Sequence, residues 1–170
     1  MQNLPGIVLI VEVQTQLYTI PANEKFLPTL LGHVGGLGSR VSEYMKLRAQ
    51  TALEELFANS IKHGYAGATS PTANHIWLAV WMEGDALHVR YEDAAPPFNP
   101  FDNLESVVQT TLQPLEERPV GGLGRLMVQR LSNDARYARI DAEATTGAEA
   151  HNRIDLVFKE ARRSVRDPAR

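Results

Sequence analysis

The chain of 170 residues contains no cysteine, which excludes disulfide bonds, thiol nucleophiles and zinc–thiolate sites. It also lacks long apolar stretches. Apolar runs such as Ile7–Val11 fall far short of the roughly 20 residues that a membrane helix needs. No basic region precedes an apolar run near the amino terminus, so we expect no signal peptide, no membrane association and a cytoplasmic location.

Neither sign of charge dominates the sequence. The formal net charge is −3 at pH 7, which gives no reason to expect direct nucleic-acid binding. The length predicts a single domain over residues 1–170 with a substantial core. We expect this core to span about residues 17–159, and the basic tail at about residues 160–170 to be frayed.

Apolar periodicity predicts the secondary structure. Helical spacing is expected over residues 26–37, 43–63 and 123–131. β-branched or alternating runs predict strands at residues 7–13, 17–20, 76–82, 87–91, 135–140 and 152–158. Because strands and helices are partly segregated along the chain, we predict an α+β fold. It would be a two-layer sandwich with a mostly antiparallel mixed sheet and helices on one face.

Three finer expectations follow from the same patterns. The apolar face of the helix at 43–63 is expected to consist of Leu47, Leu53, Leu56, Phe57 and Ile61. Residues 76–82 are apolar on both faces, which predicts a central strand with Trp77 and Trp81 in the core. Residues 98–120 lack a clean period and contain several prolines, so we expect a long loop that is functional or mobile.

Glu55, Asn59 and His63 recur at intervals of four residues, so a helix places them in one row. A carboxylate can accept a proton from a hydroxyl group or from water. A carboxamide oxygen suits Mg²⁺, a hard cation that prefers oxygen ligands and keeps several waters. Glu54 points about 100° away around the helix and does not share this face. The same spacing is also common on solvated helix faces with no such function.

A second motif begins at Asp93, at the end of an alternating strand. It enters a turn held by Pro96 and Pro97. A carboxylate in this position can accept a hydrogen bond from an exocyclic amine such as that of adenine. The alternative is a turn acid that accepts hydrogen bonds from nearby backbone amides.

A third motif, Gly121–Gly124, is rich in glycine and precedes a predicted helix. The free amides and the dipole at a helix amino terminus favour phosphate binding, and glycine lets the backbone approach the ligand closely. No Gly-Lys-Ser/Thr follows, so this is not a Walker loop, and no strand leads directly into it, as the dinucleotide pattern requires. A flexible turn without a ligand is the alternative interpretation.

In this order, the three motifs resemble those of the GHKL ATPase superfamily, which includes gyrase, the sensor histidine kinases and the mismatch-repair ATPases. The closer resemblance is to the anti-sigma-factor serine/threonine kinases of bacterial partner-switching systems. Glu55–His63 resembles the N box, Asp93–Pro100 the first glycine box, Leu115–Gly124 the lid end with the second glycine box, and Asn152–Leu156 the closing strand. The resemblance covers about residues 17–159 and implies the Bergerat ATPase fold.

The resemblance also implies a role for each matching residue. Glu55 would be the general base, and Arg118 would reach the terminal phosphate from a lid at about residues 99–120. Asn59 would be the Mg²⁺ ligand, and Asp93 would hold the adenine amine. The residues expected to bind ATP are Asn59, His63, Asp93, Ala95, Pro97, Phe98, Gly121, Gly122, Leu123 and Gly124. Ala95 stands where this box usually has glycine, and its methyl group is expected to narrow the adenine pocket.

The implied function is an ATP-dependent kinase that phosphorylates a serine or threonine of a STAS-type antagonist and thereby regulates a sigma factor. Two alternatives remain at this point. One is a binding module that sequesters a sigma factor or another regulator, with nucleotide as a conformational ligand. The other is a vestigial fold that no longer binds nucleotide. Glu55 and Asn59 favour the kinase, Ala95 leaves room for the alternatives, and a homodimer is left open.

Overall fold

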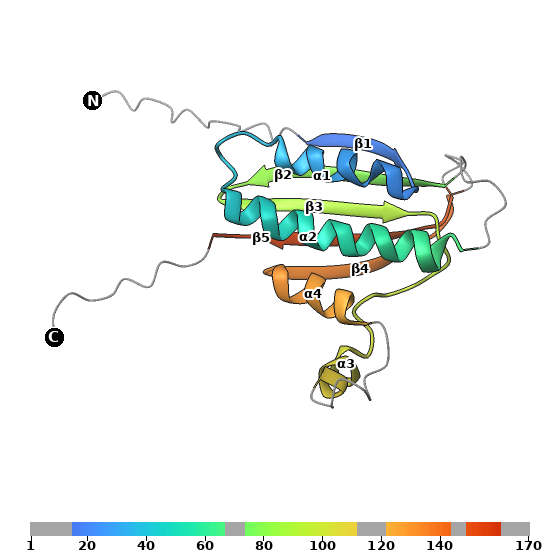
Figure 1. The fold of residues 1–170 in the computed structure, drawn as a ribbon. Helices are drawn as coiled ribbons and strands as arrows, with labels where there is room; N and C mark the ends of the chain where they lie inside the picture. Colours follow the sequence, from blue (N-terminus) through green and yellow to red (C-terminus); the bar gives the residue numbers. More distant parts are fainter. Residues whose placement is uncertain (1–14, 67–73, 112–121, 144–148, 161–170) are drawn as a thin grey trace, which may run out of the picture.

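The computed structural model describes residues 15–66, 74–111, 122–143 and 149–160. Its centre is a five-stranded sheet with the strand order β1-β2-β3-β5-β4 (Figure 1). The strands are β1 (Gln16–Pro21), β2 (His75–Glu83), β3 (Ala86–Asp93), β4 (Asp134–Ile140) and β5 (His151–Phe158). Every pairing between these strands is antiparallel. The predicted α+β fold is therefore confirmed.

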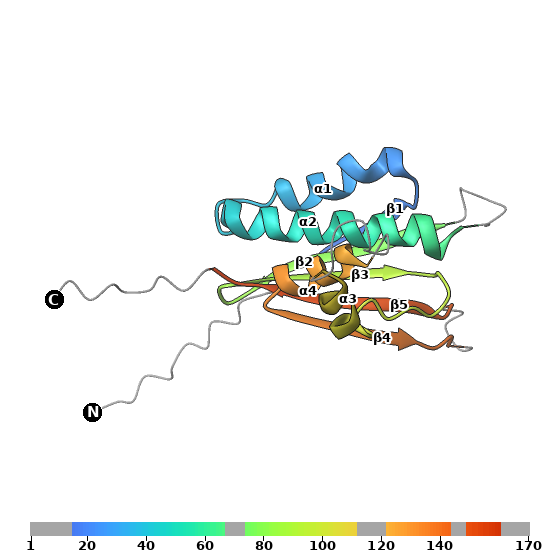
Figure 2. The same cartoon turned by 60° about the horizontal axis from the view of Figure 1, so that its bottom comes forward.

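The helices are α1 (Leu27–Gly35), α2 (Glu43–Asn59), α3 (Leu104–Thr111) and α4 (Leu123–Leu131). A short 3₁₀ turn, η1 (Glu24–Phe26), precedes α1, and a π-helical turn, η2 (Ser60–Gly64), extends α2. Figure 2 shows α1 and α2 running along one face of the sheet, and α4 packs beside α2. The sandwich has two layers as predicted, and none of the described helices is both long enough and apolar enough to cross a membrane.

Local sequence signals explain where two of the helical segments begin. The Asn23 side chain accepts a hydrogen bond from the Lys25 amide at the start of η1, and the Ser42 side chain accepts one from the Met45 amide at the start of α2. Each side chain thus satisfies an amide that has no partner within its helix.

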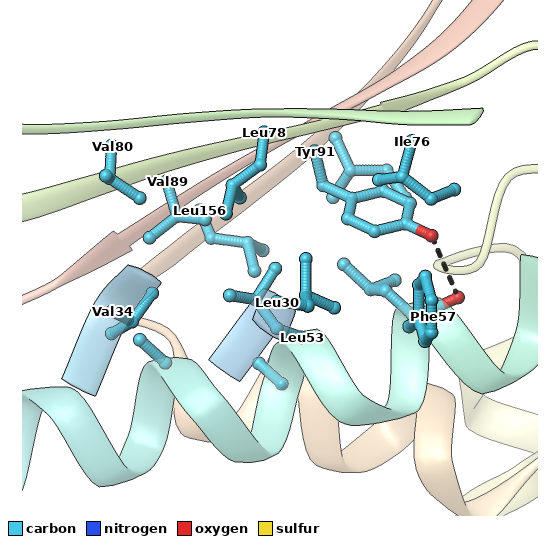
Figure 3. Close-up of a cluster of buried hydrophobic side chains, with 14 of the residues drawn as sticks. Leu30, Val34, Leu53, Phe57, Ile76, Leu78, Val80, Val89, Tyr91 and Leu156 are labelled. Atoms are coloured by element: carbon cyan, nitrogen blue, oxygen red, sulfur yellow. Dashed lines mark hydrogen bonds between the residues drawn. The ribbon is translucent and has the colours of Figure 1, made fainter. Parts of the chain in front are cut away.

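The core lies between α2 and the inner face of the sheet. Figure 3 shows Leu53 and Phe57 of α2 facing Leu78, Tyr91 and Leu156 of the strands, and each of these five side chains is at most 1% exposed. The Tyr91 ring lies within this apolar cluster, but its hydroxyl group points towards α2. The Tyr91 hydroxyl therefore places a polar group of the core at the end of α2, where the candidate site begins.

The predicted apolar face of α2 is wrong at Leu47, which is 65% exposed. Lys46 is buried instead, at 8% exposure, and its ammonium group forms an ion pair with Glu43 at 2.8 Å. A lysine can cover apolar surface with its aliphatic chain while its charge reaches a polar partner. Hydrophobicity alone therefore selected the wrong residue of this neighbouring pair.

The expected central position of residues 76–82 is confirmed, because β2 lies inside the sheet and pairs with β1 on one side and with β3 on the other. The expected burial of its two tryptophans is wrong. Trp77 is 38% exposed, and the Trp81 ring stacks on His88 with a centroid distance of 5.2 Å. Both tryptophans lie on the sheet face opposite the core residues of β2, because successive side chains alternate between the two faces. They are not core residues.

Residues 98–120 are not wholly a loop, because α3 occupies Leu104–Thr111. Leu104 and Val107 are buried, and α3 packs against α4. A helix as short as this has too few apolar positions for a clear helical period, which explains why the sequence pattern missed it. The strand predicted at residues 7–13 lies outside the described residues.

Candidate functional site

A cavity of about 230 Å³ opens between the end of α2 and the turn that follows β3. Six of the predicted site residues line it: Asn59, His63, Asp93, Ala95, Pro97 and Phe98. The fold thus joins two motifs that are separated in the chain by residues 64–92. Sequence reasoning did not assign Ser60 and Asn152 to a site, although both also line the cavity.

Asp93 is held on the cavity wall by hydrogen bonds to both of its carboxylate oxygens. Asp93 is only 6% exposed. Oδ2 accepts a hydrogen bond from the Ser60 hydroxyl at 2.6 Å, and Oδ1 accepts one from Asn152 Nδ2 at 2.7 Å and one from the Ala95 amide at 3.1 Å. In all three hydrogen bonds the Asp93 carboxylate is the acceptor. The hydrogen bond from the Ala95 amide is the contact that the alternative interpretation, a turn acid, predicts. Asp93 makes this contact and also lines the cavity.

Ser60 connects Asp93 to the hydrophobic core. The Tyr91 hydroxyl donates to Ser60 Oγ at 2.8 Å, and Ser60 in turn donates to Asp93. Burial raises the pKa of the Tyr91 hydroxyl well above its usual value, and the charge of Asp93 raises it further. Tyr91 therefore remains a donor at any ordinary pH, and the order Tyr91, Ser60, Asp93 is fixed.

Asn152 supports Asp93 from the side of β5. Asn152 is only 3% exposed. Nδ2 donates to Asp93 and to the carbonyl oxygens of Ala95 and Pro96 at 3.2 and 3.1 Å. Its oxygen accepts from the Tyr137 hydroxyl at 2.9 Å and from Arg139 Nη1 at 3.0 Å. Asn152 is thus fully engaged with protein groups and acts as a positioning residue for Asp93.

Tyr65 holds the turn that follows Asp93. The Ala94 amide donates to the Tyr65 oxygen at 2.9 Å, while the Tyr65 hydroxyl donates to the His75 carbonyl oxygen at 2.9 Å. Burial and the nearby charge of Asp93 raise the pKa of Tyr65 to about 12. The hydroxyl group of Tyr65 is therefore neutral, and it holds the turn by donating one hydrogen bond and accepting another.

The π-turn η2 determines how α2 meets the cavity. The Tyr65 amide donates to the Ser60 carbonyl oxygen at 2.8 Å, which widens the last turn of the helix. Such π-turns are rare and often occur at functional sites. Gly64 lies against Ala95, because a β-carbon at position 64 would come within 2.7 Å of the Ala95 methyl group. The methyl group that was expected to narrow the pocket is thus accommodated by a glycine on the facing element.

Asn59 has an unpaired polar atom. Its Nδ2 is buried and has no hydrogen-bond partner among the described residues. An unpaired buried amide costs about 1–3 kcal/mol. The residue also lines the cavity, so a polar ligand entering the cavity is the natural partner. His63, one turn further along the row, lines the same cavity but is exposed.

Glu55 reaches the start of α4. A β-carbon at position 124 would overlap the Glu55 carboxylate, with Cδ at 2.8 Å and Oε2 closer still. Gly122, at the amino-terminal end of α4, has a φ of 86°, a left-handed conformation that glycine adopts without strain. The predicted N-box carboxylate and the predicted glycine turn are therefore in direct contact in the fold.

The profile of a family described as a histidine kinase-like ATPase domain matches residues 28–158 of this chain. The chain belongs to this ATPase family. No curated protein matches the chain in sequence. The superfamily level of the resemblance is thereby established, and membership of a histidine kinase-like ATPase family implies ATP binding and ATP-dependent, kinase-like chemistry.

Some of the residues that the resemblance assigned to the site of this histidine kinase-like ATPase domain are not found in the cavity. Arg118, expected to reach the terminal phosphate, and Gly121, expected to bind ATP, lie outside the described residues. Leu123 is 55% exposed at the start of α4, away from the buried cavity wall. Within the described residues, the predicted glycine turn is thus represented by Gly122, Gly124 and the first turn of α4.

The residues of the domain fit a metal ion that arrives with its ligand. The described residues contain no cluster of three or more His, Asp or Glu side chains that could hold a metal ion. The carboxamide oxygen of Asn59 can offer one neutral ligand, whereas its unpaired Nδ2 is a hydrogen-bond donor and cannot bind a cation. A Mg²⁺ ion here would take most of its ligands from phosphate oxygens and water, as Mg²⁺ commonly does.

Proposed function

We propose that this protein is an anti-sigma regulatory factor that acts as a serine/threonine kinase on a STAS-type antagonist in bacterial partner switching. The family supplies ATP binding. The observation that carries the proposal is the meeting of Glu55 with Gly124, at the helix end next to the cavity of Asp93 and Asn59. A proton acceptor and a glycine turn at the α2–α4 junction then lie near a cavity whose wall holds the proposed metal ligand, Asn59, and the proposed adenine acceptor, Asp93.

The adenine end of the site would be the cavity itself. Asp93 is oriented by Ser60 and Asn152 as a hydrogen-bond acceptor, and a carboxylate pairs with the exocyclic amine of adenine but not with a carbonyl group in its place. The apolar wall includes Leu56 and Ile154, which suits the faces of a purine ring.

The reacting end would be the junction of α2 and α4. Phosphoryl transfer depends mainly on positioning and on neutralisation of charge. Glu55 would accept the proton of the substrate hydroxyl group, and the first amides of α4 would approach the phosphates beside Gly122 and Gly124. Mg²⁺, when bound by ATP and Asn59, would neutralise charge on the phosphates.

The test is a direct assay of binding and transfer. We expect ATP to bind in the micromolar range, about −8 kcal/mol, and to raise the melting temperature. Asp93→Asn turns one acceptor oxygen into a donor that faces the adenine amine, so it should weaken ATP binding in calorimetry.

Incubation of the wild type with labelled ATP and a STAS-type antagonist should yield phosphoserine or phosphothreonine. Unchanged ATP affinity in the variant would remove Asp93 as the adenine anchor.

A non-catalytic module that sequesters a sigma factor is the second candidate. It is favoured by Ala95, which is 2% exposed and lines the cavity with a methyl group in place of the usual glycine. ATP binding without any phosphoryl transfer, together with nucleotide-dependent capture of a sigma factor, would select this candidate over the kinase.

A further inference from the structure

Arg125 follows Gly124 in the first turn of α4, and its guanidinium group lies over the ring of Phe98. Its guanidinium carbon lies 5.7 Å from the centre of the Phe98 ring, and Phe98 lines the cavity. Nη2 lies 3.7 Å from the position that a β-carbon of Gly122 would occupy. One cationic group thus contacts both the cavity wall and the glycine turn.

The charge of Arg125 is not neutralised by a carboxylate in the described part of the chain. None of the ion pairs between described residues includes Arg125. Among the described residues, Nη1 donates a hydrogen bond to the backbone carbonyl oxygen of Asp102, at 3.3 Å. The Asp102 carboxylate accepts instead from Asn99 Nδ2, at 2.7 Å. The guanidinium is therefore held in place by weak contacts and keeps its capacity to bind an anion.

We propose that Arg125 binds the phosphate groups of the nucleotide. This inference rests on the proposed ATP site and adds to it a residue that the sequence motifs did not single out. The guanidinium group presents donors in a fork that matches phosphate oxygens. Arg125 would give up its long hydrogen bond to the Asp102 carbonyl oxygen and form charge-assisted hydrogen bonds to phosphate. The site would therefore bind nucleotides more tightly than nucleosides.

Arg125→Gln tests this role, because it removes the charge but keeps a polar side chain of similar reach. A charge-assisted hydrogen bond is strong enough that its loss should weaken ATP binding by about ten- to a hundredfold. Adenosine has no phosphate, so its affinity should change by less than about twofold. Titrations followed by NMR measure both ligands, since they remain accurate for millimolar dissociation constants. Arg125→Lys keeps the charge without the fork and should fall between the wild type and Arg125→Gln.

Arg130→Gln is the matched control. Arg130 lies in the last turn of the same helix and is exposed, so this variant makes the same change in net charge without affecting the cavity. An equal loss for ATP and adenosine in Arg125→Gln would mean that Arg125 only packs against Phe98, and it would overturn the inference. Unchanged ATP affinity would overturn it as well. A wild-type protein that binds neither ligand would instead overturn the proposed function, and the inference with it.

Discussion

The carboxylate of Glu55 lies against the α-carbon of Gly124, so closely that a methyl group at position 124 would overlap it. Glu55 belongs to α2 and Gly124 to α4, and these two helices pack side by side. Glu55 can therefore keep this position only if residue 124 is glycine.

Gly124→Ala should therefore impair function more than stability. The flexible end of Glu55 can move aside, and alanine favours a helix over glycine by about 1 kcal/mol, so the melting temperature should change little. The displaced carboxylate should slow phosphoryl transfer. Gly32→Ala is the control, because a β-carbon there would meet no atom within 4 Å. A Gly124→Ala protein that transfers phosphate as fast as the wild type would show that the position of Glu55 does not matter.

Glu55→Gln should separate chemistry from binding. The change removes the proton acceptor but keeps the shape, so the transfer rate should fall by about 10²–10⁴-fold while ATP affinity changes little. Glu54→Gln is the internal control, because Glu54 is exposed on another face of α2. Equal losses of transfer rate at both positions would contradict the role assigned to Glu55.

Asn59→Ala should weaken ATP binding more with Mg²⁺ present than with a chelator. The side chain would supply one ligand to an ion that the phosphates mainly hold. Titration of the wild type and the variant with ATP, each with and without Mg²⁺, isolates the metal-specific part. The same loss in both conditions would assign Asn59 to the nucleotide or to the fold rather than to the ion.

Asn152→Ala should lower both stability and ATP affinity. It removes a donor to Asp93, the acceptor of the Tyr137 hydroxyl and one of the two acceptors of Arg139 Nη1, so we expect a loss of about 1–3 kcal/mol in the free energy of unfolding. Asn133→Ala is the matched control. Asn133 accepts hydrogen bonds from Arg48 and from the Lys159 amide at the other end of the sheet. Both variants should lose stability in denaturant titrations, but only Asn152→Ala should lose ATP affinity.

Tyr65 should make the protein sensitive to alkaline pH. Its pKa is raised from 10.0 to about 12 in the folded protein. The unfolded chain therefore loses this proton first as the pH rises. The stabilising effect of the neutral hydroxyl is complete below about pH 10 and is lost as the pH rises towards about 12. Denaturant titrations across this range should show a steeper decline for the wild type than for Tyr65→Phe. Parallel declines would place the sensitivity elsewhere.

Much of the architecture follows from the sequence because local patterns determine it. Alternation of apolar residues predicted the hairpin of β2 and β3, and the spacing of apolar residues predicted α1, α2 and α4. Polar caps such as Ser42 depend on chemistry within a few residues and act before any tertiary contact forms. The order of the three motifs was also sufficient to suggest the family that the profile match then established.

Other features depended on contacts between distant residues, which no local pattern contains. The exposure of Leu47 and the burial of Lys46 depend on where α2 meets the sheet. Trp77 and Trp81 are apolar, but the helices cover only the other face of their strand. Helix α3 is too short for a clear period, and its burial depends on α4.

The candidate site divides in the same way. The sequence by itself determined which chemical groups are present, because Glu55, Asn59, Asp93 and the glycine turn stand in recognisable motifs. Only the tertiary structure decided what surrounds them: Ser60 and Asn152 on Asp93, Gly64 against Ala95, and Arg125 over Phe98. The physical reason is that a motif depends on spacing along one element, whereas a hydrogen bond or a steric contact between α2, α4 and β5 exists only after the sheet and helices have packed together.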